Sequence, residues 1–408
     1  MKLLSVDTID QAREKILDRV KAWSLKTETV TLEKGLGRVL AEDIYASCDI
    51  PGFRRSVVDG YAVLAADTTG AGEAVPAFLK QTGSVSMGKQ ADFSISRGEC
   101  AYVPTGGMLP AGADAMVMVE YAEAVGNDVA VYEAAAVGMG MVEAGEDLRN
   151  GELLLRRGTL IRPQEVGALA AAGICAFPVF VPLNLSLIST GDELIPPDHV
   201  PRMGEVRDIN TNALEALALE HGYKVISSRI LPDNEAQLEQ ALREAIASCD
   251  VAIISGGSSQ GNKDLTCDVI NRVAQPGVFT HGLAVKPGKP TILGWDNESK
   301  TLLAGLPGHP VSAIMVFKLI LGWLTDTLFN KTPLLPVPAR ISCNVPGASG
   351  RTVLQPVILH ATDEGYCAEP VFGKAGMITT LTRADGYIII DLNKEGLKRG
   401  ESVMVHLM

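Results

Sequence analysis

The chain lacks the residue patterns of several functional classes. None of its seven cysteines belongs to a CxxC pair, and its six histidines form no HxxxH pair and lie away from the cysteines in sequence. This spacing gives a zinc site little support. An odd number of scattered cysteines is also typical of thiols in a reducing cytoplasm rather than of a disulfide framework.

An excess of positive charge is also missing. Lysine and arginine total 36 against 48 acidic residues, a net charge of −12, which argues against non-specific binding to nucleic acid or to an anionic membrane. The stretch 166–191 is uncharged, but glycines and prolines interrupt it, so a transmembrane helix is not expected. Asp7 and Asp10 break up any signal peptide. We expect a cytoplasmic protein without nucleic-acid or membrane partners.

A chain of 408 residues exceeds one hydrophobic core, so several domains are expected. Short alternating segments separated by Gly, Asn and Asp predict a small β-domain, whereas the part after Leu183 alternates strand and helix. Such alternation predicts right-handed βαβ units in a three-layer α/β/α domain with a mostly parallel sheet. The predicted domains are a discontinuous N-terminal domain (1–50 and 146–182), an inserted small β-domain (51–145), the α/β domain (183–330) and a C-terminal small β-barrel (334–408). The amphipathic helix within 5–23 is assigned to the first of these, as packing or dimer surface.

Five motifs punctuated by Gly and Pro follow or precede the elements of the α/β domain. They are STGDEL (189–194), RDIN (207–210), SGGSSQGNKD (255–264), KPGKP (286–290) and GLPGHP (305–310). Open parallel sheets bind ligands at the carboxyl ends of their strands, so these loops are expected to converge there. Their candidate ligand groups are four carboxylates, the two lysines of KPGKP and several glycine amides: Asp192, Glu193, Asp208, Asp264, Lys286, Lys289, Gly256, Gly257 and Gly261. This combination suits Mg²⁺ together with a phosphate or oxyanion.

Each motif also has a structural interpretation. STGDEL and RDIN can cap helices, KPGKP can be a surface turn, and SGGSSQG, which is not a P-loop, can be a tight turn. Asp192 and its neighbour Glu193 point in different directions, so one of them is expected to face the crevice. In the β-domain, Ser56 and Asp59 precede a glycine turn, and the TGG sequence at 105–107 offers further amides.

A set of motifs follows in order along the chain: VDGYAV, PTGG, AGEDL, STGDEL, RDIN, ISGGSSQG with Asp264, KPGKP and GLPGHPVSA. In this order the set resembles the MoeA-type molybdopterin molybdenumtransferases, which are related to the gephyrin E domain. The resemblance covers nearly the whole chain. It implies an elongated homodimer with four domains per subunit, the third of which binds molybdopterin. It also implies a reaction in which adenylylated molybdopterin is hydrolysed with a divalent cation such as Mg²⁺, molybdate is inserted, and AMP is released.

The resemblance carries over residue by residue. The matching catalytic acids are Asp59, Asp147, Glu193, Asp208 and Asp264, of which Asp264 and Glu193 are the expected metal ligands. The expected substrate and oxyanion contacts are Ser255, Gly256, Gly257, Ser259, Gly261, Lys286, Lys289, Thr190, Gly191, Thr105, Gly106, Ser56, Pro307, Gly308 and Arg351, with Thr379 as a looser match. In the family dimer, the part that carries Asp59 and Asp147 approaches the α/β domain of the partner.

The chain departs from the family pattern in three places. Ser258, Asn262 and Lys263 alter the usual SGGVSxGD loop, His309 replaces a common Asn, and RRSVV precedes Asp59 in place of NSAM. Alternative hypotheses are a molybdopterin adenylyltransferase or nucleotide pyrophosphatase on the same fold, and a non-catalytic scaffold or binding protein. Molybdate and tungstate share charge and geometry, so both fit. An adenylyltransferase and cofactor-receiving enzymes are further expected partners.

Overall fold

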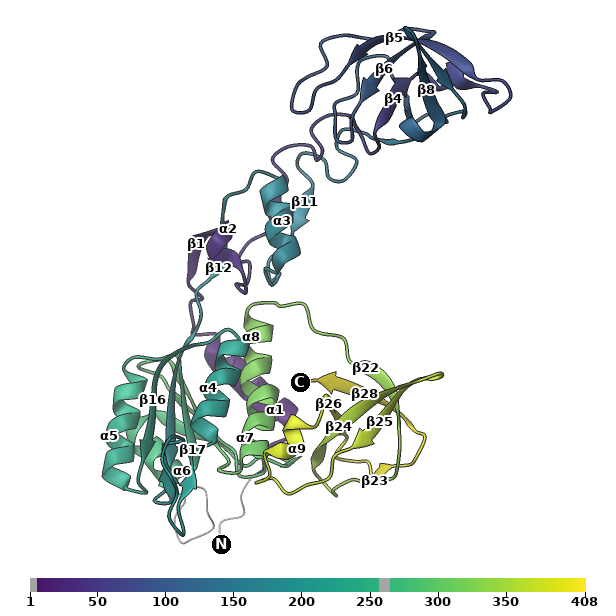
Figure 1. Cartoon of the computed structure of the whole chain (residues 1–408). Coiled ribbons are helices and arrows are strands. Elements are labelled where there is room, and N and C mark those ends of the chain that lie inside the picture. Colours follow the sequence, from purple (N-terminus) through teal and green to yellow (C-terminus); the bar gives the residue numbers. More distant parts are fainter. Residues whose placement is uncertain (1–5, 257–264) are drawn as a thin grey trace.

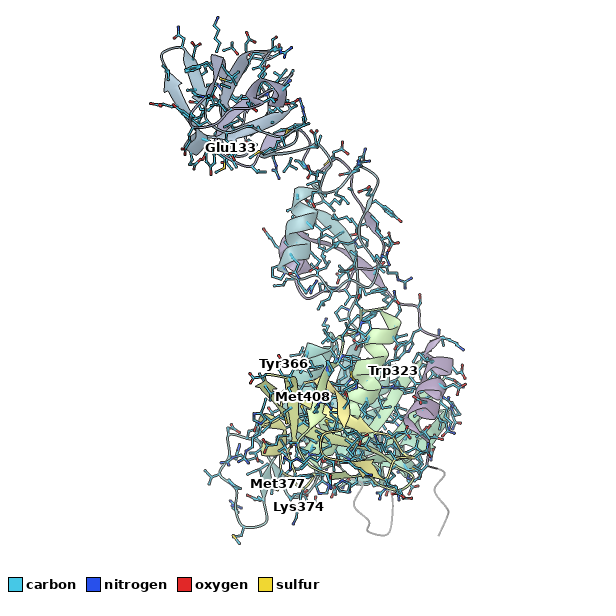
Figure 2. All side chains as sticks on the ribbon, turned by 90° about the vertical axis from the view of Figure 1, so that its right-hand side faces the viewer. Glu133, Trp323, Tyr366, Lys374, Met377 and Met408 are labelled. Atoms are coloured by element: carbon cyan, nitrogen blue, oxygen red, sulfur yellow. The ribbon has the colours of Figure 1, made fainter. Side chains whose placement is uncertain are left out.

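The computed structural model describes residues 6–256 and 265–408, and it has an elongated shape (Figure 1). A small β-domain lies at one end, and an α/β domain and a β-barrel lie side by side at the other. Glu133 marks the first end, and Lys374 and Met377 mark the second (Figure 2). The fold class predicted from the sequence, α/β with additional β-domains, is confirmed.

The middle of the molecule is formed by two separate stretches of chain. Its elements are β1 (Thr27–Thr31), α2 (Leu32–Gly35), β2 (Ile44–Tyr45), β11 (Leu153–Leu155), α3 (Pro163–Ala171) and β12 (Ala176–Phe180). Strand β1 pairs antiparallel with β12, and β2 pairs with β11. Leu40, Leu169 and Phe177 are buried between them.

The β-domain is inserted between these two stretches. It contains β3 (Arg55–Ser56), β4 (Gly60–Val63), β5 (Ala77–Ser84), β6 (Glu99–Val103), β7 (Ala115–Met118), β8 (Ala122–Val125), β9 (Asp128–Val131), β10 (Met141–Val142) and the 3₁₀ turns η1 (Ala65–Thr68) and η2 (Val119–Tyr121). Its main sheet has the order β7-β4-β6-β5-β9-β8.

The α/β domain is built around a six-stranded sheet in the order β16-β13-β17-β21-β20-β18. Its strands are β13 (Asn184–Thr190), β16 (Lys224–Leu231), β17 (Val251–Gly256), β18 (Pro276–His281), β20 (Ile292–Asp296) and β21 (Thr301–Leu306), with the short strands β14 (Leu194–Ile195), β15 (Val206–Arg207) and β19 (Val285–Lys286) outside it. Four neighbouring strands are parallel, and β20 runs antiparallel to both of its neighbours.

Helices cover both faces of this sheet, as a three-layer domain requires. They are α4 (Asn210–Glu220), α5 (Glu235–Ile246), α6 (Leu265–Val273), α7 (Pro310–Phe317), the π-helical turn η3 (Lys318–Gly322) and α8 (Trp323–Leu328). Leu242 of α5 and Ile270 of α6 pack on one face, and Leu214 of α4 and Val316 of α7 pack on the other. Side chains of a strand alternate between the two faces, so each strand contributes to both cores.

Among the described residues, one helical run (310–328) is apolar and long enough by composition to cross a membrane, and 67% of it is buried inside the protein. Phe317, Ile320 and Leu324 of this run belong to the largest hydrophobic core. Its apolar character is therefore explained by packing against the sheet.

The C-terminal domain is a closed barrel. Its elements are β22 (Val337–Ile341), β23 (Val345–Pro346), β24 (Thr352–Thr362), β25 (Gly365–Pro370), α9 (Thr379–Thr382), β26 (Gly386–Ile390), β27 (Gly396–Leu397) and β28 (Ser402–Leu407). Strand β24 pairs with both β25 and β26, which closes the ring. Strand β19 of the preceding domain adds to β24 in parallel, so the barrel is attached directly to the α/β domain.

The first helix, α1 (Ile9–Val20), differs from its predicted position in the N-terminal domain. Its buried residues Ala12, Ile16 and Val20 belong to the core of the α/β domain. The Arg13 guanidinium donates to the Leu319 carbonyl at 2.8 Å, and Asp7 accepts a hydrogen bond from Thr280 at 2.6 Å. The periodicity of the helix identified its apolar face but not the surface that this face covers.

This packing yields a test of the position of α1. We expect Ile16→Ala to lower the unfolding free energy of the α/β domain by about 2–5 kcal/mol, because the side chain is fully buried. All three tryptophans of the chain, Trp23, Trp295 and Trp323, belong to this hydrophobic core or pack against it, so tryptophan fluorescence during urea denaturation reports its unfolding. The exposed Glu14→Ala is the matched control on the same helix. Equal midpoints for the two variants would contradict the packing.

Candidate functional site

The carboxyl ends of the parallel strands bring the predicted motifs to one edge of the sheet. Thr190 at the end of β13 pairs with Gly256 at the end of β17, and Ser255 pairs with Leu306 at the end of β21. Strand β18 is antiparallel to β20, which is antiparallel to β21, so β18 also ends at this edge. The KPGKP turn (286–290) follows β18 and lies there as well. The ends of β13, β17 and β21 and the KPGKP turn therefore lie at one edge.

The start of α4 connects three of these strand ends. The side-chain amide of Asn210 donates to the Ser255 hydroxyl and to the Gly308 carbonyl, both at 2.8 Å. The hydroxyls of Ser189 and Thr211 are hydrogen-bonded at 2.7 Å. These bonds hold the ends of β13 and β17 and the residue Gly308 after β21 in place relative to one another.

Two glycines, Gly256 and Gly308, lie close together in the middle of the edge. Gly256 has a φ of +108°, and a Cβ atom added to it would lie 2.2 Å from the Thr190 carbonyl oxygen. A Cβ atom on Gly308 would lie 3.7 Å from the Gly256 Cα. Pro307 is buried beside them, and Gly308 and His309 are exposed at the start of α7. Its positive φ and the short distance to Thr190 therefore require glycine at position 256.

The two side-chain oxygens of Asp208 have different environments. The residue is 3% exposed, and its Oδ1 accepts the Thr211 amide at 3.1 Å, which is the capping role that the sequence allowed. Its Oδ2 is buried and has no hydrogen-bond partner among the described residues. Buried carboxylate oxygens are normally paired, so this atom is a candidate ligand position beside the capping bond.

Three carboxylates gather at the ends of β13 and β16. Asp192 accepts the Asp233 amide at 3.0 Å, and a Cβ atom on Gly191 would lie 2.7 Å from Glu193 Oε2, so the Glu193 carboxylate folds over this glycine. Partial burial, followed by the charges of Asp192 and Glu193, raises the pKa of Asp233 above its usual value. Carboxylates held close together in this way are suited to a hard cation.

Asp233 was not among the site residues predicted from the sequence. The strand pairing is what places Asp233 at the site. Leu231 lies opposite Thr190 in parallel register, so the loop after β16 must adjoin the loop after β13. A sequence pattern does not reveal which strands are neighbours.

The lysine turn lies on the other side of the edge. Lys286 and Lys289 are exposed, and neither forms an ion pair with a described residue. The Leu283 amide donates to the Lys289 carbonyl at 2.9 Å, and the Thr291 hydroxyl donates to the Gly288 carbonyl at 2.7 Å. A Cβ atom on Gly288 would lie 2.4 Å from a methyl carbon of Val316, so the turn packs tightly on α7. Two ammonium groups are thus held on a rigid backbone.

The C-terminal barrel supports this side of the site. Val285 and Lys286 pair with Thr352 and Val353, and the Thr352 amide donates to the Ala284 carbonyl at 2.8 Å. Arg351 therefore directly precedes the strand that holds the lysine turn. The Ala375 carbonyl accepts the Val311 amide at 3.1 Å at the start of α7, and Thr379 begins α9 shortly afterwards.

The β-domain motifs form a separate cluster. Asp59 Oδ1 accepts the Thr105 amide at 2.7 Å, the Ser56 carbonyl accepts the Gly106 amide at 2.8 Å, and the buried Ser56 hydroxyl donates to the Val58 carbonyl. Asp147 is exposed where the β-domain joins the middle domain, and its amide donates to the Ile50 carbonyl at 3.0 Å.

This cluster is far from the edge of the sheet within one chain (Figure 1). Strand β12 leads into β13 at its amino end, so the middle domain and the β-domain attach to the opposite edge of the sheet from the site. The structure therefore brings Thr190, Gly191, Glu193, Asp208 and the lysines together, but it does not bring Asp59 or Asp147 to them.

Part of the predicted phosphate loop lies outside the described residues: Gly257, Ser258, Ser259, Gly261, Asn262, Lys263 and Asp264. Within the ranges that are described, no three His, Cys, Asp or Glu side chains are placed to hold one metal ion together. The described candidates for a cation are thus the oxygen atoms of Glu193, Asp192, Asp233 and Asp208, taken singly or in pairs.

Comparisons with known proteins agree along the whole chain. Three family profiles match in order: the MoeA N-terminal region, domains I and II (7–173), the family described as "probable molybdopterin binding domain" (186–326), and the MoeA C-terminal region, domain IV (338–408). A Methanocaldococcus jannaschii protein named for molybdopterin biosynthesis is 31% identical over 94% of this chain and 92% of its own length. The molybdopterin molybdenumtransferase of Haemophilus influenzae is 28% identical over 98% of each chain.

Solved structures give the same result. A crystal structure of the MoeA protein of Pyrococcus horikoshii OT3 superimposes with a TM-score of 0.83 and 30% identity, covering 99% of this chain and 100% of the other. A second MoeA structure from the same species has a TM-score of 0.76 and 36% identity, with 99% of both chains covered.

The raised pKa of Asp233 yields a prediction about stability. A carboxyl group whose pKa is higher in the folded than in the unfolded state destabilises the fold as pH rises above the unfolded value, about 3.9. We therefore expect Asp233→Asn to raise Tm at pH 7 by about 1–3 °C without divalent cations, and to have little effect near pH 3. Thermal denaturation in EDTA at both pH values measures this. Asp363→Asn, on an exposed hairpin of the barrel, is the control. A lower Tm at pH 7 for Asp233→Asn alone would contradict the assigned repulsion.

Proposed function

The chain belongs to the MoeA family of molybdenum cofactor biosynthesis, and from this premise we propose that it is a molybdopterin molybdenumtransferase that inserts molybdate into adenylylated molybdopterin and releases AMP. The observation that carries the proposal is the edge of the α/β sheet, where carboxylates lie on one side, lysines on the other and Gly256 and Gly308 between them. The full-length match to relatives named molybdenumtransferase supports the same reaction class and disfavours an adenylyltransferase, a pyrophosphatase or a scaffold.

The dimensions of the edge suit a long substrate with separated charges. Three inter-strand spacings separate the end of β13 from the start of β20, which is about 15 Å. A pterin joined to a nucleotide through a phosphoanhydride can therefore contact both sides. The backbone around Gly256 and Gly308 lies between the two sides, and its amides can donate hydrogen bonds to phosphate oxygens.

The residues at the carboxylate side fit a divalent cation. Hard oxygen donors converge there, the pKa of Asp233 is raised partly by its acidic neighbours, and one oxygen of Asp208 is buried without a partner among the described atoms. Mg²⁺ usually takes one or two protein carboxylates, and Glu193 would hold it together with Asp264, which lies outside the described residues. Bound there, it would neutralise phosphate charge and polarise the phosphoanhydride.

The residues of the chain then have distinct roles. Lys286 and Lys289 bind the oxyanion or a substrate phosphate as fixed point charges. Asn210 holds Ser255 and Gly308 in position, so that their backbone faces the phosphoanhydride. Arg351 adds positive charge from the barrel. We retain Asp264, Asp208, Glu193, Asp59 and Asp147 as the catalytic acids and add Asp233 to the carboxylate side.

We propose that the complete site forms in a homodimer. Asp59 and Thr105 form one hydrogen-bonded cluster at the far end of the chain, whereas Glu193 and Asp208 lie at the edge of the sheet. A twofold partner can supply the first cluster to the second, as closed symmetric contacts allow. The proposed location is the cytoplasm: all seven cysteines lie in described parts of the chain and none forms a disulfide. The proposed partners are an adenylyltransferase that supplies the substrate and enzymes that receive the cofactor.

Incubating the protein with adenylylated molybdopterin, Mg²⁺ and molybdate tests the function. AMP release that depends on Mg²⁺, together with formation of active cofactor, is the expected result. ATP consumption with free molybdopterin would instead identify an adenylyltransferase, and absence of AMP release would indicate a binding protein. Replacing molybdate by tungstate in the same assay compares the two oxyanions.

The lysine turn yields a prediction about binding. We expect Lys286→Ala and Lys289→Ala each to weaken molybdate binding about tenfold, because a hydrogen bond to a charged group is worth roughly 1.5–3 kcal/mol. The salt dependence of binding should also decrease, since a charged contact is lost. Isothermal titration calorimetry at two ionic strengths measures both effects. Lys224→Ala, an exposed lysine at the amino edge of the same sheet, should bind as the wild type does. Wild-type affinity in both turn variants would leave KPGKP as a surface turn.

The shared site yields a prediction about mixed dimers. Asp59→Ala and Glu193→Ala should each abolish AMP release, because each removes one acid from both sites of the dimer. A heterodimer of the two variants keeps one intact site, so mixing should restore up to half of the wild-type activity per heterodimer. Native mass spectrometry confirms that subunits have exchanged. If exchange is complete and the mixture stays inactive, each site belongs to a single chain.

A further inference from the structure

A thiol and an imidazole meet beside the lysine turn, although the sequence keeps cysteines and histidines apart. Cys267 lies in the first turn of the described part of α6, and His281 is the last residue of β18. The Cys267 sulfur lies 3.9 Å from His281 Nδ1, within hydrogen-bond range for sulfur. Both residues are partly exposed. Neither has a role in the function proposed above.

A third group completes the arrangement. The Asn271 side-chain amide donates to the Cys267 sulfur at 3.6 Å, one helical turn further along α6. The same side chain accepts the Val278 amide through its Oδ1 at 2.8 Å, which fixes the orientation of its N–H group toward the sulfur. The sulfur therefore faces an oriented donor and a ring that can take its proton. A position near a helix N-terminus favours a thiolate as well.

The other cysteines lack this environment. Burial raises the pKa of Cys100 to about 12 and that of Cys249 to about 11, so both thiols stay protonated at neutral pH. Cys343 and Cys367 have the same intermediate exposure as Cys267. Cys367 lies opposite His360 in the barrel, but His360 is hydrogen-bonded to Glu369 at 2.8 Å. Cys343 and Cys367 are thus natural controls within the chain.

We propose that Cys267 is a reactive thiol, activated by His281 and Asn271, which reacts with hydroperoxides and other soft electrophiles, and that its modification disables the adjacent lysine turn. The connection to the turn is short: Gly282, next to His281, donates to the Thr291 carbonyl at 2.8 Å, and Leu283 donates to the Lys289 carbonyl at 2.9 Å. An added charged or bulky group at Cys267 displaces His281 and, through these two bonds, Lys289. This second half of the proposal rests on the proposed oxyanion site.

The reaction with hydrogen peroxide is balanced. The thiolate sulfur attacks one peroxide oxygen, an S–O bond forms, the O–O bond breaks, and the other oxygen leaves as hydroxide. The sulfur is oxidised by two electrons to a sulfenic acid, and the peroxide is reduced by two electrons. His281, which takes the thiol proton, can return it to the leaving hydroxide to give water.

Iodoacetamide labelling of the full chain, followed by peptide mass spectrometry of every cysteine, tests the thiol. At pH 7 an ordinary thiol of pKa about 8.5 is roughly 3% ionised, so we expect Cys267 to react at least about tenfold faster than Cys343 and Cys367. His281→Asn should bring its rate at pH 7 to within about threefold of Cys343. At pH 9.5, where ordinary thiols are mostly ionised, the variant and the wild type should agree within about twofold. Equal rates for Cys267 and Cys343 at pH 7, or an equal loss at both pH values in His281→Asn, would overturn the activation.

Molybdate calorimetry before and after peroxide treatment tests the effect on the turn. The wild type should lose at least about fivefold in affinity, while Cys267→Ser should bind molybdate normally and keep its affinity after treatment. Unchanged affinity of the treated wild type, with Cys267 shown to be oxidised, would overturn the connection to the lysines. If the untreated wild type binds no molybdate, the oxyanion site itself is wrong, and with it this half of the proposal, whereas the labelling rates still decide whether Cys267 is activated.

Discussion

The parallel register of β13, β17 and β21 is the constraint on which the candidate site depends. Because Thr190, Gly256 and Leu306 end their strands at nearly the same level, three strand ends lie side by side at one edge of the sheet. Asn210 then hydrogen-bonds two of them from the start of α4. A shift of one residue in any strand would turn its buried side chains to the opposite face, so the hydrophobic layers on both sides maintain the alignment of the site.

The edge also contains features that oppose stability. Asp233 lies beside two further carboxylates, Asp208 leaves one oxygen buried without a partner among the described residues, and Lys286 and Lys289 lie close in sequence without ion pairs to described residues. A protein optimised only for stability would pair or remove these groups. Such unpaired charges are typical of sites that bind charged ligands. A cation on one side and an oxyanion on the other would compensate them.

The elongated shape separates the motifs of one chain into two groups. The β-domain is connected through the amino edge of the α/β sheet, and the candidate site is at the carboxyl edge. The barrel is different, because β19 pairs directly with β24 and brings Arg351 next to the lysine turn. Membership of the MoeA family accounts for the presence of all these domains in one chain. The distance between the groups is the reason for proposing that two subunits share a site.

The sequence by itself determined the fold class, the alternation of strand and helix after Leu183, and the location of the Gly- and Pro-rich loops at strand ends. These are local properties, since periodicity and turn residues act over a few positions. The structure alone decided that α1 packs on the α/β domain, that Asp233 joins Asp192, that Cys267 meets His281, and that Asp59 lies far from the other acids. Periodicity defines which face of an element is apolar, but the partner of that face and the order of strands depend on how distant segments pack together.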